Sequence, residues 1–127
     1  MCSSDLVGYM YQLGEGTERN LSNAADWYER AVSAEEPMAQ TNLGWMHAHG
    51  IGVGQNFDRA VSLFNAAAEQ EYPHAQNNLG HMYLHGLGLP QDYAEALKWF
   101  QFAAEQGLAE ALSNLGYVYQ KIGRAHV

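Results

Sequence analysis

Histidine is the residue type in this sequence whose spacing looks most like a chemical site. His74, His81 and His85 fall at i, i+7 and i+11, so all three can share one face of an α-helix. Two histidines four residues apart on a helix are a pattern of zinc ligands. No carboxylate or cysteine joins them on that face, and His49 and His85 both precede a glycine loop, where the helix dipole favours histidine without any metal. We therefore predict no metal site and no cofactor.

The acidic residues and the glycine-rich loop do not suggest catalysis. Asp58, Glu69, Glu95 and Glu105 are spread over predicted solvent-facing helix surfaces and form no paired acid/base arrangement. The run GIGVG at 50–54 imitates a nucleotide-binding loop, but it follows a predicted helix instead of a strand and recurs in the next unit. No serine, histidine and aspartate set stands out, so the sequence predicts that the protein is not an enzyme.

The elements that position these residues repeat every 36 residues without insertion. The string VGYMYQLGEG at residue 7 recurs as LGWMHAHGIG at 43, as LGHMYLHGLG at 79 and as LGYVYQ at 115. A fixed period of this size is the signature of an array in which each unit packs on its neighbours.

Each unit is predicted to form two helices joined by a glycine loop. Ala60, Leu63, Phe64 and Ala67 fall at i, i+3, i+4 and i+7, which is one face of an α-helix, and alternation with period two is absent. Paired glycines can supply the left-handed backbone that ends the first helix and turns the chain. These glycines are Gly50, Gly52, Gly86 and Gly88.

Other residues mark where the helices begin. Asn56 and Asp92 are predicted to cap the second helices, because their side chains can accept hydrogen bonds from first-turn amides. Pro37 and Pro73 mark the start of the next unit.

Certain glycines and aromatic residues are assigned to structure. A glycine inside a helix costs about 1 kcal/mol relative to alanine, so its recurrence suggests that a neighbouring helix packs on the bare backbone. These glycines are Gly44, Gly80 and Gly116. Bulky residues of the second helices are expected to fill the space between layers, and they are Trp27, Phe64, Trp99 and Phe100.

The repeated string NLGxMY, followed by GxGL, a polar spacer, Asp92, Ala96, Trp99 and Phe100, resembles the Sel-one-like repeat (SLR), a relative of the tetratricopeptide repeat. The resemblance covers residues 7–120. It implies an all-α fold, an α-solenoid of helix-loop-helix repeats with about seven helices. It also implies a scaffold or adaptor for protein–protein interaction, often bacterial.

The array divides into units 7–42, 43–78 and 79–114 and a partial unit 115–120. Residues 1–6 and 121–127 break the repeat and resemble translations of a common sequencing adapter, so we expect them to be non-biological and the chain to be a fragment of a longer array. The last unit would then leave an apolar face open, which predicts self-association through uncapped ends.

Composition narrows the class of partner. The chain has 14 acidic residues, 6 lysines and arginines, and a net charge of -8, which argues against nucleic acid, because phosphate binding needs clustered basic residues. No apolar run is long enough for membrane insertion. The single cysteine, Cys2, lies in the suspect N-terminal tail and permits no disulfide framework. The expected partner is a protein or peptide.

By the resemblance, the first helices line a concave groove that binds this partner. The positions expected to line it vary between units, whereas packing positions stay nearly constant. They are Tyr9, Met38, Thr41, Trp45, His49, His74, Asn77, His81, His85, Glu110, Ser113 and Tyr117. Tyr9, Trp45 and Tyr117 are the expected aromatic anchors. Another interpretation buries Trp45 partly between neighbouring first helices.

Two other functions remain open at this point. One is a metal-binding or enzyme-associated module that uses the groove histidines, and the other is a structural spacer within a longer array. The invariant Asn42, Asn78 and Asn114 are expected to hold the units together, although the family resemblance also allows them to bond a peptide backbone.

Overall fold

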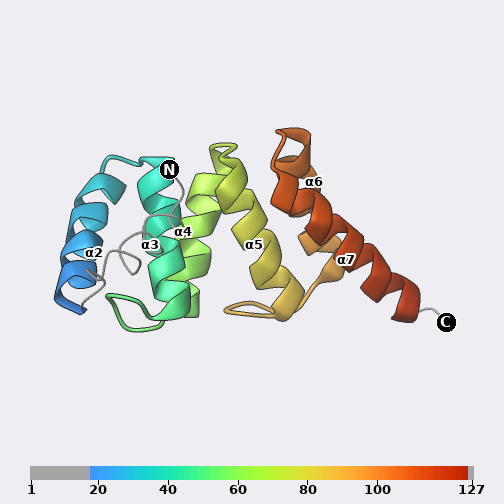
Figure 1. The fold of residues 1–127 in the computed structure, drawn as a ribbon, viewed down its shortest axis with the longest axis horizontal. Helices are drawn as coiled ribbons and strands as arrows, with labels where there is room; N and C mark the ends of the chain where they lie inside the picture. The colour runs from blue at the N-terminus through green and yellow to red at the C-terminus, as the bar shows by residue number, and fades with distance from the viewer. Residues whose placement is uncertain (1–17, 126–127) are drawn as a thin grey trace.

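The computed structural model describes residues 18–125, and these fold into α-helices that follow one another along the long axis of the molecule (Figure 1). They are α2 (Glu18–Val32), α3 (Pro37–His49), α4 (Phe57–Glu69), α5 (Pro73–His85), α6 (Tyr93–Glu105) and α7 (Ala109–Ala125). The described part of the chain contains no strand. The predicted all-α solenoid is confirmed, and the helix count is close to the seven expected, since the first predicted helix lies outside the described residues.

The first helices of the second and third units, α3 and α5, begin and end where the sequence predicts. Each starts with a proline, Pro37 or Pro73, at a position where a missing backbone N–H costs nothing. Each is followed by a glycine in the left-handed region, Gly50 or Gly86, both with φ of 65°.

The second helices, α4 and α6, begin at side-chain caps. Asn56 accepts a hydrogen bond of 3.0 Å from the backbone N–H of Arg59. Asp92 accepts the equivalent bond of 3.1 Å from Glu95. Both predicted caps are confirmed, and each satisfies one of the orphan donors of the first helical turn.

The glycine loops also pack closely against the preceding unit. Gly52 has φ of 76°, and a Cβ there would lie 2.6 Å from the carbonyl oxygen of Leu21 in α2. Gly88 has φ of 77°, and a Cβ there would lie 2.8 Å from the carbonyl oxygen of Phe57 in α4. Only glycine combines this backbone conformation with so close an approach.

Within the first helices, glycine serves packing at two positions and not at the third. Gly44 faces the ring of Phe64, and Gly80 faces the ring of Phe100. At Gly116 an added Cβ would have no neighbour within 4 Å, so the expectation of a packed helix there is wrong. No described residue takes the place beside Gly116 that Phe64 and Phe100 take beside Gly44 and Gly80.

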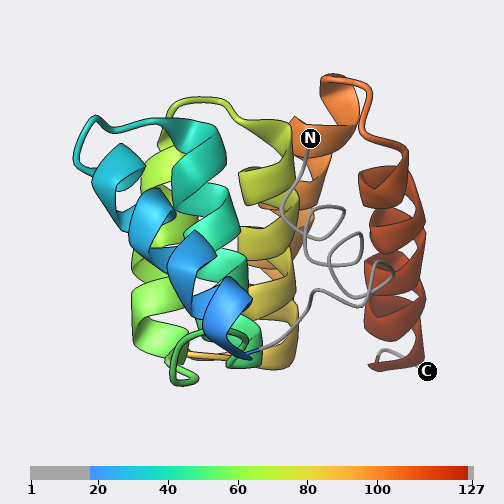
Figure 2. The ribbon, with the colours of Figure 1, turned by 60° about the vertical axis from the view of Figure 1, so that its left-hand side comes forward.

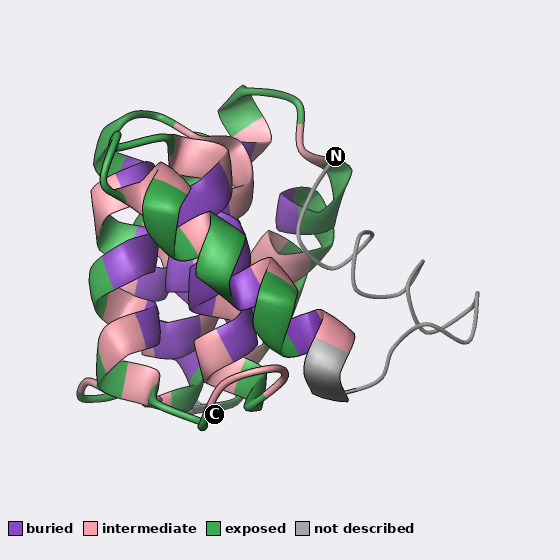
Figure 3. Ribbon diagram, turned by 90° about the vertical axis from the view of Figure 1, so that its left-hand side faces the viewer, coloured by how far each residue is buried: buried purple, intermediate pink, exposed green. Residues whose placement is uncertain are grey.

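The core consists of apolar clusters between successive helices, with buried residues facing inward and exposed residues outward (Figure 3). Phe64 and Phe100 are fully buried within it. Trp99 is half-buried and packs against the cluster formed by α4 and α5. These three aromatic residues fill the space between layers as expected.

Trp27 does not fill the space between layers, although the sequence predicts that it should. Its side chain is 66% exposed and lies under the guanidinium of Arg30. Leu63 occupies the same place in its unit and is buried, because residues of α2 and α3 cover it. No described helix precedes α2, so nothing equivalent covers Trp27 among the described residues.

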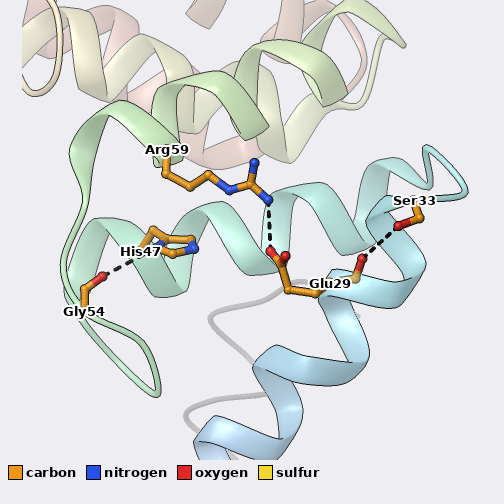
Figure 4. Close-up of polar contacts among 5 residues, drawn as sticks. All are labelled: Glu29, Ser33, His47, Gly54 and Arg59. Atoms are coloured by element: carbon orange, nitrogen blue, oxygen red, sulfur yellow. Dashed lines mark hydrogen bonds and ion pairs between the residues drawn. The ribbon is translucent and has the colours of Figure 1, made fainter.

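Polar links join helices of different units. The Nε2 of Gln70 donates to Oε1 of Gln40 at 2.8 Å, and Gln106 donates to Gln76 in the same way at 2.7 Å. Figure 4 shows an exposed ion pair of the same sequence separation, in which Arg59 of α4 reaches Glu29 of α2 at 2.9 Å.

The last helix continues past the end of the repeat. Residues 121–125 extend α7, and Ile122 packs on the cluster that contains Leu84 and Val118. The adapter origin of 121–127 stays a prediction, and residues 1–6 lie outside the described part of the chain. The helices stand roughly side by side in the rotated view (Figure 2), with the C-terminal end of α7 at one edge of the array.

No helix among residues 18–125 is both long and apolar enough to cross a membrane.

Candidate functional site: a pocket between the first helices

A pocket of about 430 Å³ lies where α3, α5 and α7 meet the intervening α4. Three of these are the first helices of successive units, and α5 contacts both α3 and α7. The lining residues are Trp45, Ala48, His49, Phe57, Phe64, His74, Asn77, Asn78, His81, Met82, His85, Leu87 and Glu110. A cavity of this size has room for a few side chains of a bound segment.

Most of the positions expected to line the groove do line this pocket. They are Trp45, His49, His74, Asn77, His81, His85 and Glu110. The structure therefore brings together residues from three helices, α3, α5 and α7, that lie apart in the sequence. Tyr9, which was also expected there, lies outside the described residues.

Four expected residues lie elsewhere. Thr41 is fully buried, and its hydroxyl donates to the carbonyl oxygen of Pro37 at 2.8 Å, so its assignment to the binding surface is wrong. Met38 is half-buried outside the pocket. Ser113 and Tyr117 are exposed on α7 but do not line the pocket, and Lys121 lies 5.3 Å above the ring of Tyr117.

Trp45 takes part in both packing and the pocket. Its side chain is half-buried and packs against two of the core clusters, as one interpretation of the sequence held. Another part of it lines the pocket, where its ring lies 4.4 Å from that of His49 at an angle of 45°. Its aromatic surface is thus fixed by the core and offered to the pocket.

The rings of His81 and His85 form a second flat surface. Their centroids are 6.0 Å apart and the planes differ by 4°, so the two imidazoles are parallel along one face of α5. The ring of Phe100 in α6 packs against that of His81, with centroids 5.3 Å apart and planes at 77°.

Hydrogen bonding fixes the state of His81. The Nδ2 of Asn114 donates to Oδ1 of Asn77 at 2.8 Å and lies 3.2 Å from Nε2 of His81. With Asn114 as donor, Nε2 of His81 accepts and carries no proton. Burial, and then the neighbouring His85, lower the pKa of His81, and burial also lowers the pKa of His49. Both imidazoles are therefore neutral near pH 7.

The invariant asparagines behave differently from one another. Asn114 links α7 to α5 through the bonds just described. Asn42 is buried, and its side-chain oxygen has no hydrogen-bond partner among the described residues. Asn78 lines the pocket, although the sequence had favoured a structural role for it.

Sequence reasoning missed several apolar lining residues. Phe57 follows the N-cap of α4, and Leu87 sits within a glycine loop, so both were counted with elements that turn the chain. A signal was present, because Tyr93 and Ile51 show that both positions stay apolar in the neighbouring unit.

In the part of the chain that the structure describes, no three histidine, cysteine, aspartate or glutamate side chains are grouped so that they could hold a metal ion. The pocket histidines contribute ring surfaces and single hydrogen-bonding atoms.

Comparisons with known proteins agree with this architecture. A family model described as Sel1 repeat matches residues 6–35, 37–72, 73–108 and 109–121. The last three segments start at or beside the first residues of α3, α5 and α7, six residues ahead of the unit starts at 43, 79 and 115. No curated protein matches the chain.

Two solved structures are similar to it. A Sel1 repeat protein from Oxalobacter formigenes shares 40% identity with a TM-score of 0.76, over 89% of this chain and 46% of that protein. A protective antigen present in uropathogenic Escherichia coli strains, which displays an SLR fold, shares 37% identity with a TM-score of 0.78, over 91% of this chain and 25% of that protein. This chain thus spans less than half the length of either.

Proposed function

The chain belongs to the Sel1 repeat family, and from that premise we propose that it holds an extended segment of a partner protein in the pocket between α3, α5 and α7. Sel1 repeats are generally non-enzymatic scaffolds for protein–protein interaction. The proposal assigns that general role to a specific surface of this chain.

The observation that carries the proposal is the composition of the pocket. Apolar side chains such as Phe57, Met82 and Leu87 stand beside the polar tips of His74 and Asn78. Such a mixture suits a peptide, whose side chains supply apolar contact and whose backbone supplies hydrogen bonds. Other lining positions vary between units, since Trp45 corresponds to His81 and His74 corresponds to Glu110, and this variation on a nearly constant core supports a role in recognition.

A peptide-display selection against the protein tests the proposal. Selected peptides should lose binding to a Trp45→Ala variant, because Trp45 offers the largest fixed aromatic surface in the pocket. The Trp27→Ala variant is the matched control, since it removes the same side chain from an exposed position outside the pocket.

A second variant guards against loss of folding, because Trp45 also packs on the core. His85→Ala removes an exposed ring that lines the pocket and should weaken the same peptides while the helical circular dichroism stays unchanged. Peptides that bind all three variants as tightly as the parent protein would contradict the proposal and favour the structural spacer.

A further inference from the structure

We infer that the pocket recognises an arginine side chain of the segment that it holds. This inference rests on the proposed function and adds the chemistry of the partner to it. Three features of the pocket favour arginine: its charge, its flat ring surfaces and the hydrogen-bonding atoms of its lining.

The charge of the lining favours a cation. Glu110 contributes a carboxylate, and no lysine or arginine is among the described residues that line the pocket. The whole chain carries a net charge of -8. A guanidinium beside Glu110 would gain a charge-assisted hydrogen bond, whereas an acidic residue would meet the like charge of Glu110.

The ring surfaces favour a planar cation. Trp45 with His49 forms one aromatic wall from α3, and His81 with His85 forms a parallel-ring wall from α5. A guanidinium is flat, weakly hydrated and stacks on aromatic faces, while the compact ammonium of lysine stays strongly hydrated. Arginine therefore suits these walls better than lysine does.

The imidazoles favour a hydrogen-bond donor. A protonated His49 or His81 would repel a cation, but burial lowers the pKa of both and keeps them neutral near pH 7. The neutral imidazole of His49 and the carboxamide oxygen of Asn78 can accept hydrogen bonds, whereas Nε2 of His81 already accepts from Asn114. A guanidinium has five N–H donors to offer. The aliphatic stem of arginine would cover Phe57 and Leu87.

Short capped peptides with one central residue between glycines are the probe. The central residue is arginine, citrulline or glutamate, and citrulline keeps the flat shape of arginine without its charge. The readout is the indole N–H signals in the NMR spectrum, because Trp45 lines the pocket and the other tryptophans, Trp27 and Trp99, do not.

The arginine peptide should shift the Trp45 signal in a saturable way and leave the Trp27 signal in place. The citrulline peptide should bind about tenfold more weakly, which is the effect of losing one charge-assisted contact. The glutamate peptide should produce no saturable shift. Equal binding of the arginine and citrulline peptides would overturn the inference.

A pair of variants tests the role of the pocket carboxylate. Glu110→Gln should weaken the arginine peptide about fivefold and leave the citrulline peptide unchanged. Glu69→Gln removes the same charge from an exposed position on α4 outside the pocket and should change neither. Equal effects of the two variants would show that only the overall charge of the protein matters, and would overturn the inference.

The failure of this inference is distinguishable from that of the proposed function. Display-selected peptides that depend on Trp45 but contain no essential arginine would overturn the arginine assignment and leave the binding role intact. If the arginine peptide gives no saturable shift and no selected peptide depends on Trp45, the arginine assignment and the proposed binding function are both overturned.

Discussion

The ring of Phe64 in α4 lies directly against the backbone of Gly44 in α3. A Cβ built on Gly44 would come within 2.7 Å of Cε1 of Phe64 and 2.9 Å of its Cδ1, closer than real Cβ atoms approach. One period later Phe100 stands against Gly80 in the same way, at 2.6 Å. Two helices of a unit can approach this closely only because the first carries no side chain at that position.

Alanine at Gly44 or Gly80 should therefore destabilise the protein. Overpacking of a core costs about 1 to 3 kcal/mol, and it exceeds the gain of about 1 kcal/mol that alanine brings to a helix. Gly116→Ala is the matched control, since nothing lies within 4 Å of its added Cβ, and it should stabilise α7 by up to about 1 kcal/mol. Urea unfolding measures all three, and equal effects would contradict the packing described.

The paired glutamines should contribute to stability across the unit boundary. Gln76 is buried and receives the side chain of Gln106 at 2.7 Å, so Gln106→Ala should cost about 1 to 3 kcal/mol by leaving that oxygen without its partner. Gln101→Ala on the exposed side of α6, the helix that Gln106 caps, is the control and is expected to change stability by less than about 0.5 kcal/mol. Thermal melts that shift equally would show that the buried bond adds nothing.

Stability should depend on pH through the pocket histidines. Burial first, and then the charge of His85, lower the pKa of His81, and burial lowers that of His49. The unfolded chain then binds more protons than the folded one between the folded and unfolded pKa values. The free energy of unfolding should be flat above about pH 6.5 and decrease as the pH falls below it.

The groups that surround His81 make the test specific. His85 on the same helix, Glu110 and Asn114 from α7, and His49 from α3 share the pocket or contact it. His81→Gln removes one titrating ring and should flatten the decrease seen in urea unfolding at about pH 5 relative to about pH 8. An unchanged slope would show that His81 does not titrate as its burial implies.

The open face of α7 is predicted to promote self-association. The side chains of Leu112 and Tyr119 on α7 are 60% and 54% exposed. Leu112 corresponds to Gln40 and Gln76, each of which accepts a hydrogen bond from the glutamine that follows the next helix. Leu112→Gln restores the side chain found at this position in the other units and should lower the association seen in sedimentation. Phe102→Gln removes an exposed apolar group from α6 and is the control. A monomer at every concentration of the parent protein would contradict this prediction.

The 36-residue period was enough to predict the helices and their caps, because these depend on local sequence. It also predicted the columns, by which we mean sets of equivalent positions 36 residues apart, because these repeat exactly. It could not show whether a neighbour is present. Gly116 and Trp27 sit in columns that are packed elsewhere, yet both are exposed because no described helix covers them. Whether a residue is packed depends on the adjacent unit, so the sequence of one unit alone does not predict its burial.

The site was predictable by column but not by residue. Thr41 and Asn77 occupy the same position in successive units, and Asn77 reaches the pocket while Thr41 turns back to bond its own helix. Threonine inside a helix commonly bonds the carbonyl four residues earlier, so that signal was available. Leu87 reaches the pocket from a loop, and its place there depends on how the loop packs on the next unit.

Photo-crosslinking tests the central claim most directly, that the pocket between the first helices holds the bound segment. A benzophenone amino acid is placed at His85, which lines the pocket, or at Phe102, which is exposed on α6 outside it, and each protein is illuminated with a display-selected peptide. The account predicts a crosslink from position 85 and none from position 102. A crosslink from position 102 alone would place the peptide outside the pocket and contradict the account.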